Sequence, residues 1–398
     1  MKFYFGFFIL FIAACSSCFM SNKNAAVIND EFLRKELNFL SEKMVNYQSK
    51  LKIDSLMIPR SLNEDGSLLV TNSKNWTSGF YPGTLWQLYG YSKEESLKES
   101  AIIWTSFVEK EKWDIHTHDL GFKISSCFGK GYKLEKNEAY KDVIIQASAT
   151  LIKRFNAKIG VIRSWDWNAD KWQFPVIIDN MMNLEMLFDA TELSGDSIYY
   201  KVAYQHAKTT LHNHFRKDNS SYHVVDYDTL TGQPRLKITH QGYSDESAWS
   251  RGQAWGLYGF TTAFGRTGDS TFLKQAKLIG EYYFNHPNLP KDKIPYWDFN
   301  APNIPNEPRD VSAATVMASG LIELANYVPG EKMKYLNMAD QILLSLSKKE
   351  YQSEVPPFLL SQSTGSLPGN FEIDVPLSYA DYYYVEALIR RLSGLKSR

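Results

Sequence analysis

Four aspartates stand at or just before segments of small and apolar residues: Asp119, Asp179, Asp245 and Asp310. Two such carboxylates that face each other across a bound molecule can divide acid and base work, because each raises the pKa of the other. For each aspartate taken alone, helix capping is the simpler interpretation. Asp119 and Asp179 begin consecutive segments, so the pair is chemically sensible, but spacing alone does not favour it over Asp179 with Asp245.

Other chemistries lack a convincing motif. His116 and His118 lie beside Asp119, but no HExxH and no paired His-x-x-x-His accompanies them, so we expect no metal site. The sequence has no GxSxG nucleophile elbow and no phosphate-binding glycine loop. We therefore expect carboxylate chemistry without a cofactor.

The segments that would position these residues alternate along the chain. Six are small or apolar nearly all round, as in helices buried on both sides, at residues 76–90, 119–134, 179–193, 245–264, 310–327 and 378–392. Six others have one polar face, at residues 31–51, 93–109, 138–155, 197–215, 271–284 and 332–346. This repeat predicts an all-α (α/α)6 barrel, a closed ring with the buried helices inside. An open helical solenoid is the alternative, but no polar capping repeat supports it.

Long irregular segments rich in turn residues and aromatics precede three of the buried segments, at residues 160–174, 218–243 and 285–306. In a ring of this kind, the loops that lead into the inner helices converge on one face. We therefore expect the binding site in a funnel on that face.

The first 20 residues indicate a lipoprotein signal peptide and tether. Lys2 and an apolar run precede Cys15, whose thiol would receive the lipid. An ordinary signal peptide is the alternative, and Cys18 is a second candidate for lipidation. We expect an exported protein, anchored by lipid alone in the bacterial envelope, at the cell surface or in the periplasm. Residues 25–398 would form a single (α/α)6-barrel catalytic domain without disulfides, since only Cys127 remains.

Composition narrows the class of partner. Lys plus Arg and Asp plus Glu are balanced at 44 each, so the chain offers no basic field for nucleic acid. Aromatic residues make up 14% of the chain, with 10 Trp and 24 Tyr. Core packing accounts for most of them, but in an exported neutral protein the excess also fits carbohydrate binding, in which ring faces stack on sugars. Nothing in the sequence predicts an oligomeric state.

Several segments together resemble one enzyme family. They are HDLGF at 118–122, DNMMN at 179–183, QGYSD at 241–245 and WSRGQAW at 249–255, with supporting matches at 76–83 and 381–388. Over essentially the whole mature chain, the sequence is similar to the unsaturated glucuronyl hydrolases, family 88 of the glycoside hydrolases. The resemblance implies the same (α/α)6 barrel that the repeat predicts.

The resemblance also selects among the aspartates. It implies that Asp179 is the general acid/base and Asp119 its essential partner. It places further side chains around the sugar: His118, Trp76, Trp165, His223, Gln241, Arg251 and Trp255. Arg251 would pair with the substrate carboxylate, Trp165 and Trp255 would stack on the sugar ring, and Gln241 and His223 would fix hydroxyls and the attacking water. Pattern alone would put Trp255 in the core and His223 on the surface, and Tyr81 competes with Trp76.

The implied reaction removes a 4,5-unsaturated uronic acid from the non-reducing end of lyase-generated oligosaccharides, by protonation of C4 and hydration of the vinyl ether. Some family members bind sulfate with a Ser-x-x-Ser-x-Lys stretch; Ser363 and Ser366 match it, but Pro368 replaces the lysine and an ordinary turn is the alternative. We expect glycosaminoglycan fragments such as those of chondroitin or heparin, with ulvan- or gellan-type fragments as alternatives. An unsaturated rhamnogalacturonyl hydrolase and a non-catalytic surface glycan-binding lipoprotein are the alternative functions.

Overall fold

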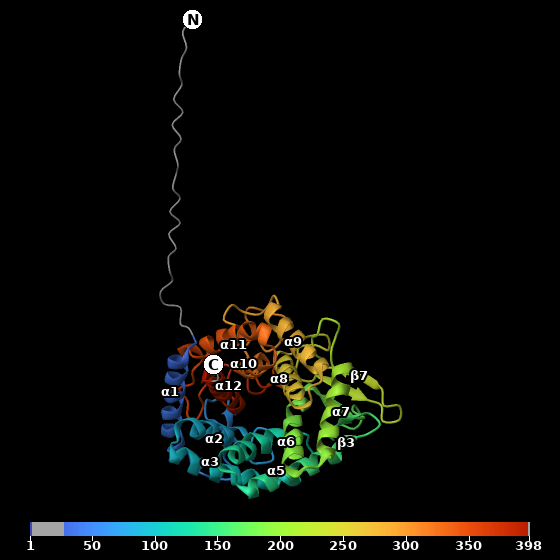
Figure 1. Ribbon diagram of the computed structural model, residues 1–398, viewed down its shortest axis with the longest axis horizontal. Helices are drawn as coiled ribbons and strands as arrows, with labels where there is room; N and C mark the ends of the chain where they lie inside the picture. Colours follow the sequence, from blue (N-terminus) through green and yellow to red (C-terminus); the bar gives the residue numbers. More distant parts are fainter. Residues whose placement is uncertain (2–27, 397–398) are drawn as a thin grey trace.

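The computed structural model describes residue 1 and residues 28–396, and its helices alternate between the outside and the inside of a ring (Figure 1). The outer helices are α1 (Asp30–Gln48), α3 (Glu95–Val108), α5 (Glu138–Leu151), α7 (Ser197–Asn213), α9 (Ser270–Asn285) and α11 (Lys332–Leu346). The inner helices are α2 (Phe80–Ser92), α4 (Lys130–Glu135), α6 (Leu184–Ser194), α8 (Ser250–Thr267), α10 (Val311–Tyr327) and α12 (Ser378–Lys396). The last inner helix, α12, packs against α1, α2 and α10 and so closes the ring. The predicted (α/α)6 barrel is confirmed, and the open solenoid is wrong.

The burial pattern explains which helices lie inside. In α1, the buried Leu33, Leu37, Leu40 and Met44 recur at helical spacing, so one face packs inward and the other meets solvent. In α2, every residue from 80 to 89 is buried. The predicted targeting segment, with Cys15, lies outside the described residues, and the predicted domain boundaries stay predictions.

Two inner helices begin with irregular turns rather than with regular helix. A π-helix, η2 (Gly121–Gly129), precedes α4, and a 3₁₀ helix, η4 (Ile178–Asn183), precedes α6. The Asn183 Oδ1 atom accepts a hydrogen bond from the Phe122 N–H at 3.1 Å. A Cβ on Gly121 would lie only 2.6 Å from the Cα of Asn183, so the backbones pack in direct contact there. This close approach brings Asp119, two residues before η2, and Asp179, in the first turn of η4, to the same cavity.

Short strands, which the sequence analysis did not predict, stiffen the long loops. β5 (Pro175–Ile177), β6 (Val224–Tyr227) and β7 (Pro234–Ile238) form an antiparallel sheet in that order. β1 (Ile58–Leu62) pairs with β2 (Leu68–Thr71), and β3 (Phe155–Asn156) with β4 (Val161–Ile162). The remaining short helices are η1 (Glu109–Trp113), η3 (Ile152–Arg154), η5 (Pro329–Glu331) and η6 (Lys349–Tyr351). The loops at the funnel are thus partly ordered by backbone pairing.

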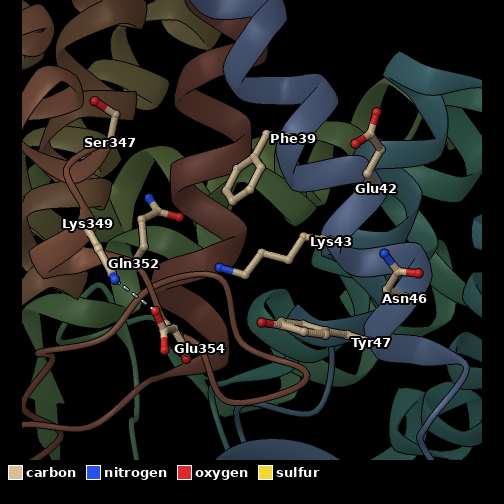
Figure 2. Close-up of a pocket in the computed structure, with 10 residues that line it drawn as sticks. Phe39, Glu42, Lys43, Asn46, Tyr47, Ser347, Lys349, Gln352 and Glu354 are labelled. Carbon is tan, nitrogen blue, oxygen red and sulfur yellow. Dashed lines mark ion pairs between the residues drawn. The ribbon is translucent and has the colours of Figure 1, made fainter.

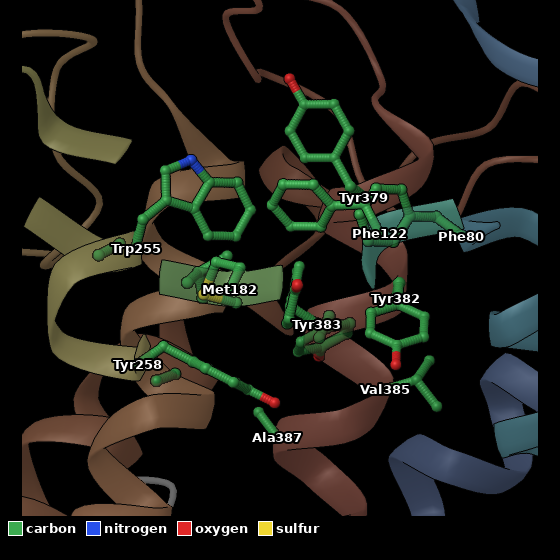
Figure 3. Close-up of a cluster of buried hydrophobic side chains, with 14 of the residues drawn as sticks. Phe80, Phe122, Met182, Trp255, Tyr258, Tyr379, Tyr382, Tyr383, Val385 and Ala387 are labelled. Atoms are coloured by element: carbon green, nitrogen blue, oxygen red, sulfur yellow. The ribbon is translucent and has the colours of Figure 1, made fainter. Parts of the chain in front are cut away.

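An aromatic cluster fills the middle of the barrel (Figure 3). The ring of Phe122 lies 5.2 Å from that of Trp255, which in turn lies 5.5 Å from the ring of Tyr383. Phe80 and Tyr382 continue the cluster at 5.3 Å. These rings fill the centre of the barrel, so packed side chains limit how deeply a molecule can enter from the loop end.

None of the helices in the described part of the chain combines the length and the apolar character needed to cross a membrane.

Candidate active site

A cavity of about 470 Å³ opens where the loops before the inner helices converge. Seven of the residues predicted for the site line it: Trp76, His118, Asp119, Trp165, Asp179, Gln241 and Arg251. The funnel expected from the repeat is therefore present, and it contains both aspartates selected by the resemblance.

Asp179 is the buried acid of this cavity. It lies in the first turn of η4 and is 9% exposed. Its Oδ2 atom has no hydrogen-bond partner among the described residues. Burial raises the pKa of Asp179 to about 7, and the charge of Asp119 adds to the rise, although His118 and Arg251 oppose it. Asp179 can therefore hold a proton near neutral pH, as a general acid must.

His223 faces Asp179 as a neutral imidazole. Its Nδ1 atom accepts the backbone N–H groups of His240 and Gln241, both at 3.0 Å, which places the ring proton on Nε2. Burial lowers the pKa of His223 well below its usual value. The Nε2 atom lies 3.7 Å from Asp179 Oδ2. His223 is thus buried behind Asp179 without lining the cavity itself, rather than on the surface as its loop position alone suggested.

Asp119 has the opposite protonation preference. Its Oδ2 atom accepts the Thr117 hydroxyl at 2.8 Å, and its Oδ1 atom lies 3.1 Å from His118 Nε2. Burial alone would raise the pKa of Asp119, but His118 and Thr117 outweigh burial and lower it below its ordinary value. The cavity therefore pairs a carboxylate, Asp119, with a carboxylic acid, Asp179, which is the division of roles that acid/base catalysis needs.

The other two aspartates do not join this pair. Asp245 is exposed on a loop five residues before α8, and its carboxylate accepts the Thr239 N–H at 2.8 Å. Asp310 caps α10 and is fully buried against Arg251. The alternative pair of Asp179 with Asp245 is therefore wrong.

Arg251 lines the cavity, but its charge is already paired. Its Nη1 atom lies 2.6 Å from Asp310 Oδ2, and its terminal nitrogens donate to the Thr364 and Gly365 carbonyls at 2.6 and 2.5 Å. Gln241 Nε2 donates to the same Gly365 carbonyl at 3.2 Å. Arg251 thus fixes the wall formed by residues 364–365, and its predicted contact with a substrate carboxylate stays a prediction.

Aromatic side chains form two walls. Trp165 stacks on Trp167, with ring centroids 5.0 Å apart and planes 13° apart. Trp76 packs against Tyr379 at 4.8 Å and lines the cavity, whereas Tyr81 is 3% exposed and packs in the core. Flat rings on two sides suit a sugar ring, and Trp76 rather than Tyr81 holds that position.

Three predicted substrate contacts lie behind the cavity wall. Trp255 is fully buried, and Phe122 rather than Trp255 lines the cavity, so direct stacking of Trp255 on the sugar is not what this geometry offers. Ser363 is fully buried, and the Ser366 hydroxyl accepts the Gly369 N–H at 3.2 Å. Neither serine lines the cavity. Both serines lie in a segment paired by backbone bridges, Ser363 with Val375 and Ser366 with Phe371.

Residues that the sequence analysis missed complete the cavity. Arg60 and Glu372 line it and form an ion pair of 2.6 Å, although they stand 312 positions apart. Phe371 and Tyr379 also line it. Trp167 carried a sequence signal, because it lies two residues after Trp165 in an aromatic loop.

A second hollow lies on the outside of the ring, between α1 and the end of α11 (Figure 2). Lys43 lies over the rings of Phe39 and Tyr47, and an ion pair joins Lys349 and Glu354 at 3.7 Å. None of the predicted site residues lines this hollow.

Across residues 28–396, no group of three or more His, Cys, Asp or Glu side chains is arranged to hold a metal ion.

No family model matches this chain. Several known proteins are similar to it over most of its length, and they are unsaturated glucuronyl or unsaturated chondroitin disaccharide hydrolases. An unsaturated glucuronyl hydrolase of Formosa agariphila is 46% identical over 355 residues, which cover 88% of this chain and 87% of that protein. An unsaturated chondroitin disaccharide hydrolase of Streptococcus pneumoniae is 31% identical over 370 residues, 90% of this chain and 92% of that protein.

Solved structures agree. A crystal structure of an unsaturated glucuronyl hydrolase specific for heparin superposes with a TM-score of 0.88 at 43% identity, over 93% of this chain and 99% of that one. The unsaturated glucuronyl hydrolase of Bacillus sp. GL1 superposes with a TM-score of 0.84 at 28% identity, over 92% and 98%. With this identity over most of both chains, the protein belongs to the unsaturated glucuronyl hydrolases, family 88 of the glycoside hydrolases.

Proposed function

We propose that this protein removes the 4,5-unsaturated uronic acid from the non-reducing end of lyase-generated glycosaminoglycan oligosaccharides. The observation that carries the proposal is the pair of acids in the cavity, because a buried Asp179 with a pKa of about 7 stands beside an Asp119 whose pKa is lowered. Such a pair supplies a proton and a stabilising negative charge at one point.

The proton goes first to the sugar. Asp179 transfers its proton to C4 of the C4=C5 double bond, and the electron pair of that bond forms the new C4–H bond. The positive charge left at C5 is shared with the ring oxygen, and the ionised Asp119 stabilises it. This step differs from ordinary glycoside hydrolysis, in which the acid protonates the oxygen of the scissile bond.

Water then adds at C5. The Asp179 carboxylate accepts a proton from the attacking water, which returns Asp179 to its acid form. The resulting hemiketal opens to a ketone at C5 and leaves a hemiacetal at C1. The C1 hemiacetal then collapses to an aldehyde, and its hydroxyl proton passes to the departing oxygen, so that the remaining sugar leaves with a free hydroxyl. The His223 Nε2–H, 3.7 Å from Asp179 Oδ2, is placed to hold the water next to the acid.

The similar proteins support the substrate class. Their names include chondroitin disaccharides and heparin, and a further neighbour, from Streptococcus agalactiae, was solved with dGlcA-GalNAc6S at 28% identity and a TM-score of 0.77. These are unsaturated fragments of glycosaminoglycans, and the stacked Trp165 and Trp167 and the ring of Trp76 suit such sugars.

The proposal includes the location. Lys2, the apolar run that follows and Cys15 support export and attachment by a lipid. A chain held at the envelope would meet glycosaminoglycan fragments after lyases have cut the polymer. Labelling of cells with a radioactive fatty acid, followed by purification of the protein, tests the anchor: Cys15→Ser should abolish the label, whereas Cys127→Ser should retain it.

Turnover of purified disaccharides tests the activity. The unsaturated uronate absorbs ultraviolet light until its double bond is hydrated, so loss of absorbance reports the reaction. Turnover of chondroitin or heparin disaccharides supports the proposal. Turnover of rhamnogalacturonan disaccharides alone would replace it with the pectin-directed activity, and saturable binding without turnover would replace it with a glycan-binding role.

A further inference from the structure

The two arginines that line the cavity differ in how their charges are paired. Arg251 is 1% exposed and donates to Asp310 and to two carbonyls. The Arg60 side chain is 20% exposed and uses only its Nε atom, which donates to Glu372 Oε1 at 2.6 Å. The two terminal nitrogens of Arg60 have no hydrogen-bond partner within the described part of the protein. Arg60 therefore presents an unused pair of donors to the cavity.

Arg60 is held rigidly. It lies in β1, and the hydroxyl of the next residue, Ser61, donates to the Pro376 carbonyl at 2.8 Å. The Glu372 side chain is 3% exposed, and the Glu372 carbonyl accepts the Gly365 N–H at 2.7 Å. Glu372 thus belongs to the same cavity wall that Arg251 fixes, and it holds the Arg60 guanidinium by one edge.

Arg60 also marks the mouth of the cavity. Arg60, Phe371 and Glu372 line both the active-site cavity and a neighbouring hollow of about 500 Å³ on the outside. The Phe371 ring is 45% exposed between the two. The unsaturated ring must lie at Asp179 to react, and a sugar attached to it would then extend toward the rim that Arg60 and Phe371 line.

We propose that Arg60 binds a sulfate group on the sugar attached to the unsaturated uronate, while Phe371 supports the ring of that sugar. This inference rests on the proposed function and names a specificity determinant of the same site. The two free nitrogens of a guanidinium match two oxygens of a sulfate. Glu372 keeps the arginine aligned, and its negative charge moderates the affinity for the anion.

The experiment compares two unsaturated disaccharides that differ only by a sulfate on the second sugar. Arg60→Ala should lower kcat/KM for the sulfated disaccharide by about 10- to 100-fold, the range expected for loss of a charge-assisted hydrogen-bonded pair. The loss should lie mainly in KM and should be at least tenfold larger for the sulfated disaccharide than for the unsulfated one. Glu372→Gln removes the competing charge and should lower KM more for the sulfated disaccharide than for the unsulfated one.

Arg266→Ala is the matched control. Its side chain is 23% exposed and pairs with Asp189, but it lies near the far end of α8 from Arg251, so neither disaccharide should be affected. Equal losses on both disaccharides for Arg60→Ala, or no loss on either, would overturn the inference while leaving the proposed function intact. If Arg60→Ala does not fold, an unchanged KM for Glu372→Gln overturns it. If the unaltered protein turns over neither disaccharide, the proposed function fails first.

Discussion

Asp179 Oδ2 lies 3.7 Å from the Nε2 atom of His223, an imidazole whose other nitrogen already accepts two backbone N–H groups. A neutral imidazole cannot supply the positive charge that a buried carboxylate needs, so Asp179 remains easier to protonate than to ionise. His118 lies instead 3.1 Å from Asp119. His118 thus lowers the pKa of Asp119, whereas burial keeps the pKa of Asp179 raised although His118 opposes it.

The first prediction concerns the pH dependence of kcat/KM. The reactive form carries a proton on Asp179 and none on Asp119. Because the pKa of Asp179 is about 7, the rate should fall about tenfold per pH unit above that value. The lowered pKa of Asp119 should keep the acidic limb below the ordinary range of aspartate. Steady-state rates from pH 3 to pH 9 check this, and a rate that rises through pH 8 would contradict it.

A second prediction concerns stability. The folded pKa of Asp179 is raised from 3.8 to about 7, so its contribution to stability is greatest below pH 4 and is lost as pH rises to about 7. Asp179→Asn carries no charge at any pH. Between pH 5 and pH 8, the free energy of unfolding of the variant should therefore gain about 2–3 kcal/mol relative to the unaltered protein. Urea unfolding at both pH values measures it, and a constant difference would refute it.

The third prediction concerns Arg251 and Asp310, which are 1% exposed and fully buried, respectively. Arg251→Met leaves the Asp310 carboxylate buried without its cation, which should cost about 3–5 kcal/mol of stability. Adding Asp310→Asn removes the stranded charge, so the double variant should be more stable than Arg251→Met alone. Denaturant unfolding of the full cycle tests this coupling, and purely additive effects would contradict it.

The fourth prediction concerns the turn that carries Asp119 into the cavity. A Cβ on Gly79 would lie 2.2 and 2.5 Å from the carbonyl oxygens of Lys123 and Phe122, which are backbone atoms with little room to move. Gly79→Ala should therefore destabilise the protein by about 1–3 kcal/mol and reduce activity. Gly330→Ala is the control, because nothing lies within 4 Å of its Cβ. Similar thermal unfolding of the two variants would show that the contact yields easily.

The helical ring could be predicted from the sequence because buried apolar residues recur at helical spacing. The outer helix α11 spans Lys332–Leu346, the range that its single polar face predicted. The second and third inner segments were predicted as plain helices but begin as the turns η2 and η4. The residues of η2 and η4 are buried like those of a regular inner α-helix, so the hydrophobic pattern does not distinguish these helix types.

Fewer of the residues that form the active site could be predicted from the sequence. Capping and catalysis favour the same residue type at the same position, so only the family resemblance selected Asp179 and Asp119. Long-range pairs left no local signal: Arg251 meets Asp310 across 59 positions and Arg60 meets Glu372 across 312. The motif at Ser363 and Ser366 gave no sign that both side chains are buried and that neither lines the cavity, so their predicted contact with sulfate stays a prediction.

Turnover of an unsaturated disaccharide by Asp179→Asn tests whether Asp179 is the proton donor. The loss of ultraviolet absorbance measures this turnover. If Asp179 supplies the proton to C4, the rate should fall about a thousandfold or more while the circular dichroism spectrum stays unchanged. Asp245→Asn, at the exposed aspartate outside the cavity, should retain the full rate. A folded Asp179→Asn protein with a rate near that of the unaltered enzyme would show that Asp179 is not the proton donor.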